Sequence, residues 1–122
     1  MLRDRVVVID DDPDFRELLC FCIADLGFTC VEAGSCCEAL PLLDRERGRV
    51  RVVLLDYFMP GLSPPACARA VLDHVEPGVP VVLVSAAVDI AARAAEVGLG
   101  RFLAKPFEIS ALREIVGRAG EA

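Results

Sequence analysis

The chain has 122 residues, of which 55% are hydrophobic and 26% are charged. This length and composition predict one compact folded domain over residues 1–122 and exclude a disordered chain. Its 19 acidic and 13 basic residues give a net charge of −6, so the surface lacks the basic stripe that a nucleic-acid backbone requires. We therefore expect no direct nucleic-acid partner.

The apolar segments are too short to cross a membrane, because none approaches the roughly 18 consecutive apolar residues that a transmembrane helix needs. The first four residues lead straight into a strand-like run, without the charged start and apolar stretch of a secretory signal. These observations predict a cytoplasmic protein without membrane contact.

Runs rich in β-branched residues alternate with helical patterns along the whole chain. In order, the predicted elements are a strand at Arg5–Ile9, a helix from Pro13 to Leu26, a strand at Phe28–Ala33, a helix after Ser35, a strand at Val50–Leu55, a helix from Pro64 to about Val75, a strand at Val79–Val84, a helix from Asp89 to Gly98, a strand at Arg101–Ala104 and a helix over about Ile109–Arg118. Asp12 and Asp89 are expected to cap helices. Ser35 and Glu38 form a capping box, and Pro41 is expected to kink the second helix or delay its start.

Strands that alternate with helices predict a parallel sheet covered on both faces. Right-handed crossovers then lead to a doubly wound α/β sandwich. In such sheets ligands bind beyond the carboxyl ends of the strands.

The cysteine pattern does not indicate a zinc site or a disulfide framework. No Cys-x-x-Cys pair occurs, and the only histidine is His74, which we expect at the surface. Without a secretory signal, a reducing compartment disfavours disulfides. We expect free thiols, mostly in or near the core, at Cys20, Cys22, Cys30, Cys36, Cys37 and Cys67.

Polar residues follow four of the five predicted strands. Asp10–Asp12 follow the first, Asp56 the third, Ser85 the fourth and Lys105 the fifth. Carboxylates gathered at one edge of a sheet repel one another unless a hard cation lies among them, and oxygen ligands suit Mg²⁺. A lysine and a hydroxyl can bind phosphate oxygens, and an aspartate can act as a nucleophile towards phosphorus.

Four sequence stretches, each at a predicted strand end, resemble the receiver domain of bacterial two-component response regulators. They are Val-Val-Val-Ile-Asp10-Asp11-Asp12-Pro, Val-Leu-Leu-Asp56-Tyr-Phe-Met-Pro-Gly, Val-Leu-Val-Ser85-Ala and Phe102-Leu-Ala-Lys105-Pro-Phe. Four such motifs in order are far more specific than one. The resemblance implies a flavodoxin-like, five-stranded parallel sheet of order 2-1-3-4-5 and a single receiver domain over residues 1–122.

The resemblance also implies a phosphoacceptor and a metal site. Asp56 would accept a phosphoryl group from the phosphohistidine of a histidine kinase or a histidine phosphotransfer protein. Asp10 and Asp11 would form an acidic pair around Mg²⁺, Asp11 as a direct ligand and Asp10 largely through water. Asp56 and the backbone carbonyl of Phe58 would complete the protein ligands.

The remaining motif residues would bind the phosphoryl group and report its presence. Ser85 would hydrogen-bond the phosphoryl group, and Lys105 would pair first with Asp56 and then with a phosphoryl oxygen. Pro106 implies a cis peptide. Phe102 occupies the aromatic switch position, on a face formed by the fourth helix, fifth strand and fifth helix. That face would bind a partner or a second copy of the chain.

Two alternatives to a phosphoacceptor signalling domain stay open at this point. Asp10–Asp12 contain the Asp-x-Asp element of haloacid-dehalogenase-type phosphatases, but Asp14 stands where those enzymes have Thr or Val, and the chain is short for that class. The other alternative is a vestigial receiver that serves only as a dimerisation or binding module. The stretch Leu62–Pro65 departs from the family pattern, and the segment from Ser85 to Lys105 is about two residues shorter than in common members.

Overall fold

The computed structural model describes residues 2–118, which form one five-stranded parallel sheet of order β2-β1-β3-β4-β5. This confirms the predicted doubly wound architecture and strand order. The strands are β1 (Arg5–Ile9), β2 (Thr29–Ala33), β3 (Val50–Asp56), β4 (Val81–Ser85) and β5 (Arg101–Ala104). The helices are α1 (Pro13–Asp25), α2 (Cys36–Glu46), α3 (Pro64–Asp73), α4 (Ile90–Glu96) and α5 (Ile109–Arg118), with a 3-10 turn η1 (Arg47–Arg49) before β3.

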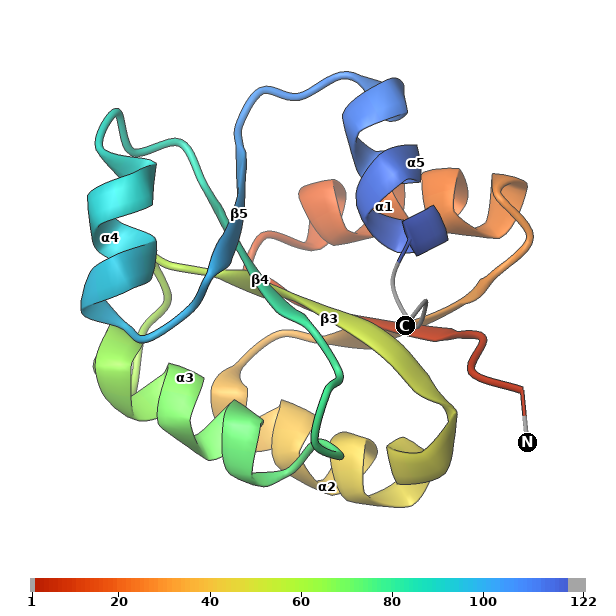
Figure 1. Ribbon diagram of the computed structural model, residues 1–122, viewed down its shortest axis with the longest axis horizontal. Coiled ribbons are helices and arrows are strands. Elements are labelled where there is room, and N and C mark those ends of the chain that lie inside the picture. The colour runs from red at the N-terminus through yellow and green to blue at the C-terminus, as the bar shows by residue number, and fades with distance from the viewer. Residues whose placement is uncertain (1, 119–122) are drawn as a thin grey trace.

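Helices cover both faces of the sheet, with α1 and α5 on one face and α2 and α3 on the other (Figure 1). Alternate residues of β3 enter the two resulting cores. Val52 and Leu54 pack with α1 and α5, whereas Val53 and Leu55 pack with α2, α3 and α4. The central strands are therefore apolar on both faces, and within residues 2–118 no helix is long and apolar enough to cross a bilayer.

Local signals fix where the helices around the sheet begin and end. The side chain of Asp12 accepts hydrogen bonds from two first-turn amides of α1, and Gly27, at φ 94°, follows its end. The Ser35 hydroxyl accepts from the backbone N–H of Glu38 at 3.1 Å. Glu38 in turn accepts from the backbone N–H of Gly34 at 2.9 Å, one residue earlier than in a standard capping box.

Of the two effects expected of Pro41, the delayed helix start is wrong, and so is the side-chain cap expected of Asp89. Helix α2 begins at Cys36 and continues through Pro41, so the proline does not delay its start. The proline side chain is exposed, where its ring does not displace the core. Asp89 stands before α4 but makes no side-chain capping hydrogen bond, because its carboxylate pairs with Arg93 instead.

The expectation that all cysteines are free thiols is also wrong. Cys20 on α1 and Cys30 on β2 form a disulfide, with Cα atoms 5.3 Å apart. Cys22, Cys36, Cys37 and Cys67 are free. Sequence spacing could not reveal this pairing, because it depends on how closely α1 packs beside the edge strand β2.

Removing this disulfide should lower the free energy of unfolding. A cross-link between residues 10 apart restricts the unfolded chain by about 2–3 kcal/mol in the chain-entropy model. We expect the double variant Cys20→Ser/Cys30→Ser to lose about that amount in urea unfolding without reductant. The matched variant Cys37→Ser, which alters an exposed free thiol, should unfold like the parent. Equal stability of all three proteins would show that the cross-link does not form in solution.

Candidate functional site

The polar residues predicted at the strand ends meet at one edge of the sheet. Asp10 follows β1, Asp56 and Ser85 close β3 and β4, and Lys105 follows β5. The exposed fractions of Asp10, Asp56 and Ser85 are only 3%, 8% and 0%. Among residues 2–118 these three are the buried polar or charged side chains. Burying such groups is costly without partners, so their contacts determine what the site can do.

Lys105 supplies the positive charge between the two buried carboxylates. Its Nζ lies 3.1 Å from Oδ2 of Asp10 and 3.5 Å from Oδ1 of Asp56. The same atom lies 4.0 Å from the ring centroid of Phe15 on α1, a distance typical of a cation–π contact. The backbone N–H of Lys105 donates to the carbonyl of Ser85 at 2.8 Å. The peptide to Pro106 is cis, as the family resemblance implied.

Backbone contacts fix the other site residues. Oδ1 of Asp10 accepts from the backbone N–H of Asp12 at 2.9 Å, and Arg16 donates to the Asp10 carbonyl at 2.8 Å. The Ser85 hydroxyl accepts from the backbone N–H of Ala87 at 3.1 Å. The site is thus held by its own loops as well as by the sheet.

Three carboxylates are close enough to share a cation. One oxygen from each of Asp10, Asp11 and Asp56 lies within 4.8 Å of the others, and Asp11 is exposed on the solvent side. All three donors are hard oxygen atoms, which is the chemistry that Mg²⁺ prefers. The donor set therefore fits a magnesium ion.

The electrostatic environment of Asp56 disfavours its charged form. Burial, followed by the negative charge of Asp10, raises the pKa of Asp56 from 3.8 to about 6, although the charge of Lys105 acts in the opposite direction. One lysine therefore does not compensate the acidic cluster. The site retains an excess of negative charge that a divalent cation would neutralise.

Two further predicted residues, Phe58 and Phe102, are exposed at the surface. The side chain of Phe58 is 57% exposed and packs edge-on against Tyr57, with ring centroids 4.8 Å apart. The side chain of Phe102 on β5 is 43% exposed. Sequence reasoning missed Phe15 as a neighbour of Lys105, because its position in an apolar helical pattern indicates only a core residue.

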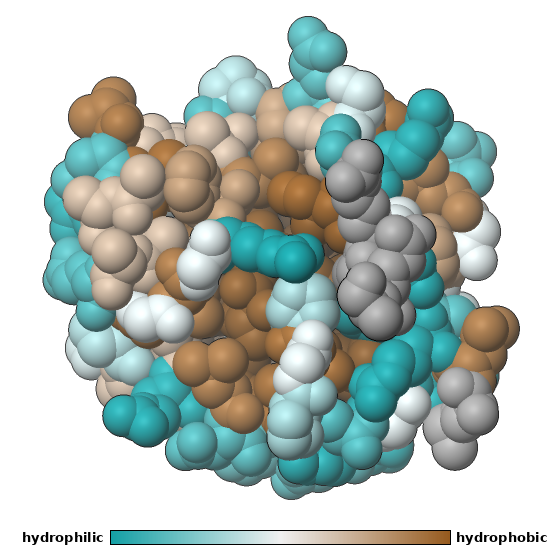
Figure 2. Space-filling model, in the orientation of Figure 1, coloured by the Kyte–Doolittle hydropathy of each residue, from teal (hydrophilic) through white to brown (hydrophobic). Residues whose placement is uncertain are grey.

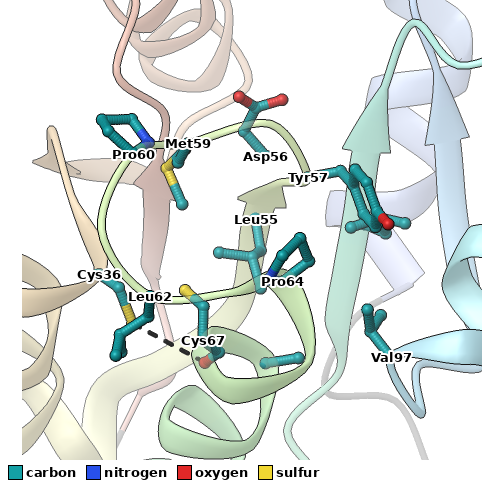
Figure 3. A pocket seen from close by; sticks show the side chains of 12 residues that line it. Cys36, Leu55, Asp56, Tyr57, Met59, Pro60, Leu62, Pro64, Cys67 and Val97 are labelled. Atoms are coloured by element: carbon teal, nitrogen blue, oxygen red, sulfur yellow. Dashed lines mark hydrogen bonds between the residues drawn. The ribbon is translucent and has the colours of Figure 1, made fainter.

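The loop after Asp56 rests on an apolar pocket. The pocket is lined by residues of this loop and by Cys36 of α2 and Cys67 of α3. Figure 3 shows the Asp56 carboxylate pointing away from both cysteine sulfur atoms. Burial raises the pKa of Cys67 far above its ordinary value, so this thiol is protonated at neutral pH. We interpret the pocket as structural support for the loop.

The comparison with known families identifies the family of this chain. A family model described as the response regulator receiver domain matches residues 6–117. The chain belongs to this family. The geometry above is therefore that of a receiver domain of two-component response regulators, and the phosphatase alternative is not favoured.

Curated relatives of this receiver domain include proteins of similar and of greater length. The chemotaxis protein CheY of Pseudomonas aeruginosa is 31% identical, and the alignment covers 96% of both chains. The DNA-binding response regulator MtrA of Mycolicibacterium smegmatis is 32% identical, with 96% of this chain covering 49% of MtrA. The chain thus spans about half of MtrA.

Solved structures agree with this assignment. The response regulator TrrA of Thermotoga maritima, solved in complex with Mg²⁺-BeF, superposes with a TM-score of 0.80 at 26% identity, covering 94% of this chain and 97% of TrrA. A receiver domain protein from Clostridium thermocellum gives a TM-score of 0.82 at 24% identity, covering 93% and 91% of the two chains. The latter likeness supports the fold.

The raised pKa of Asp56 predicts a pH-dependent stability in metal-free buffer. Because the pKa of Asp56 is higher in the folded protein than its ordinary value of 3.8, protonation of Asp56 stabilises the fold. This stabilisation is fully present below pH 3.8 and is lost as the pH rises through about 6. Relative to Asp56→Asn, we expect the parent to gain about 1 kcal/mol in unfolding free energy between pH 7.5 and pH 5. Urea unfolding in EDTA measures this difference. Parallel pH profiles for the two proteins would contradict the assignment of the raised pKa to Asp56.

Proposed function

We propose that Asp56 accepts a phosphoryl group from the phosphohistidine of a histidine kinase or of a histidine phosphotransfer protein. Receiver domains of response regulators are phosphorylated by histidine kinases. The observation that carries the proposal for Asp56 is the placement of its buried carboxylate beside the Lys105 ammonium and within 4.8 Å of the carboxylate oxygens of Asp10 and Asp11. Which kinases act on the protein, and in response to which signal, are properties of the whole protein.

The acidic cluster is proposed to hold Mg²⁺ through Asp10, Asp11, Asp56 and the backbone carbonyl of Phe58. The hard-oxygen donor set and its uncompensated negative charge support this assignment. When bound, the cation would neutralise negative charge on the phosphoryl oxygens.

The residues of this chain would do the remaining work. An Oδ atom of Asp56 attacks the phosphorus, and the N–P bond of the phosphohistidine breaks with its electron pair returning to the imidazole nitrogen. The Lys105 ammonium, now shared between Asp10 and Asp56, would move to a phosphoryl oxygen. The Ser85 hydroxyl would donate to another oxygen in place of its present acceptor role towards Ala87.

The domain would therefore assist its own phosphorylation and dephosphorylation rather than turn over a separate substrate. Hydrolysis of the Asp56 acyl phosphate by water would return the carboxylate. We propose a cytoplasmic location, which accords with the expected source of the phosphoryl group. In that reducing compartment Cys20 and Cys30 would be held as thiols, and their disulfide would form on oxidation.

The signalling surface is proposed to be the face formed by α4, β5 and α5. Adding about two negative charges at Asp56 would draw in Ser85 and let Phe102, which is 43% exposed, follow. Figure 2 shows apolar residues over much of the surface around α4 and β5. That surface suits a protein partner or a second copy of the chain.

Phosphotransfer separates this proposal from its alternatives. With acetyl phosphate and Mg²⁺, we expect the parent to gain one phosphoryl group by intact mass and Asp56→Asn to gain none, because the amide cannot form the acyl phosphate. Asp73→Asn, a change at the exposed end of α3, is the matched control and should be phosphorylated like the parent.

Each alternative predicts a different pattern. If the protein were a phosphatase, the Asp56→Asn variant would still hydrolyse phosphate monoesters, whereas the Asp10→Asn variant would be inactive. A vestigial receiver would neither become phosphorylated nor bind beryllofluoride with Mg²⁺. Either pattern would overturn the proposed function.

A further inference from the structure

The residue directly after the proposed phosphoacceptor connects three parts of the fold. Tyr57 is buried, with 7% of its surface exposed. Its backbone N–H donates to the carbonyl of Val84 on β4 at 3.4 Å. Its hydroxyl accepts a hydrogen bond from Nη1 of Arg93 on α4 at 3.0 Å. In Figure 3 its ring extends from the loop on the side opposite Pro60.

Arg93 contacts the aromatic ring of Tyr57 as well as its hydroxyl. Its guanidinium carbon lies 5.2 Å from the Tyr57 ring centroid, within the range of a cation–π contact. Its Nε also lies 3.3 Å from both carboxylate oxygens of Asp89. Asp89 therefore orients the arginine instead of capping α4. Helix α4 has only seven residues, and this contact joins it to the residue that follows Asp56.

Tyr57 also lies between the two groups of this loop that would face the cation. On one side is the carboxylate of Asp56, and on the other is Phe58, whose backbone carbonyl is a proposed ligand. The Phe58 ring packs edge-on against Tyr57 at 4.8 Å. The Tyr57 ring is thus attached to the backbone between the two proposed ligands, at a residue whose N–H bonds to the carbonyl of Val84.

We propose that Arg93 and Tyr57 form a clasp through which α4 holds the backbone from Asp56 to Phe58 in the conformation that binds the cation. The proposal rests on the proposed function of the site. Arg93 and Tyr57 are positioning residues, because they act through the backbone and not by contact with the cation or the phosphoryl group. The clasp thus couples occupancy of the site to the placement of α4.

Coupling of this kind is reciprocal. If the closed clasp improves cation affinity by some factor, then cation binding must stabilise the closed clasp by the same factor. Bound Mg²⁺ should accordingly slow the opening of α4. This second effect occurs away from the ligands, so it can be measured separately from affinity.

The first test is a double-mutant cycle on Mg²⁺ affinity, measured by titration calorimetry. Tyr57→Phe removes the hydroxyl and keeps the ring, and Arg93→Met removes the guanidinium and keeps an unbranched stem. We expect each variant to bind Mg²⁺ about fivefold more weakly, and the double variant to bind no more weakly than either single one. Arg69→Met, at an exposed arginine of α3, is the control and should match the parent.

The second test is hydrogen exchange of the α4 amides with and without Mg²⁺. We expect Mg²⁺ to slow exchange about fivefold in the parent and to have no effect in Tyr57→Phe or Arg93→Met. If the parent responds and the variants respond equally, or if the two affinity losses simply add, the clasp is overturned and the proposed function stands. If the parent itself binds neither Mg²⁺ nor beryllofluoride, the proposed function fails and the clasp fails with it.

Discussion

The burial of two carboxylates beside one ammonium group is the constraint on which the site depends. Asp10 and Asp56 are almost inaccessible to water, and Lys105 is the cation that lies within 3.5 Å of both. An unpaired buried carboxylate would be strongly unfavourable, so the lysine makes the arrangement possible. The lysine only partly offsets the other effects, because burial, followed by the negative charge of Asp10, still raises the pKa of Asp56.

The parallel sheet brings these charged groups together in one candidate cation site. Ile9 pairs with Leu55, Asp56 with Val84, and Ser85 with Ala104. This register brings the ends of four strands to one level, so residues distant in sequence meet without any long loop. The two apolar cores on either face hold those strand ends in place. The excess negative charge is therefore fixed in position before any cation arrives, as preorganised sites require.

The sequence was informative wherever a residue's position follows from its strand. Asp10, Asp56, Ser85 and Lys105 could be predicted to meet because each directly follows a parallel strand. Contacts between helices and loops could not be predicted in this way. The Cys20–Cys30 disulfide depends on the spacing of α1 and β2.

The same limit applies to Phe15 and Arg93. The contact of Phe15 with Lys105 depends on how α1 lies beside the loop after β5. Asp89 has the sequence signature of a helix cap, yet its carboxylate pairs with Arg93, which also donates to the Tyr57 hydroxyl. Which partner a side chain contacts depends on distances in the folded structure, and a single sequence does not contain those distances.

The loop after Asp56 is supported unequally on its two sides. Towards α2 and α3 it rests on buried apolar side chains, and Pro64 opens α3 directly after the Ser63 cap. Towards α4 it is held by the polar contact of Tyr57 with Arg93, whose side chain is partly exposed.

The polar contact with α4 links this loop to the proposed signalling face. Helix α4 has two buried residues, Ile90 and Ala94, no side-chain cap, and a fully exposed Val88 in its entry loop. Displacing α3 would disturb a packed core, and displacing α4 would break the partly exposed Tyr57–Arg93 contact and uncover Ile90 and Ala94. Helix α4 therefore meets the loop through a polar contact as well as through the core, on the side of the proposed signalling face.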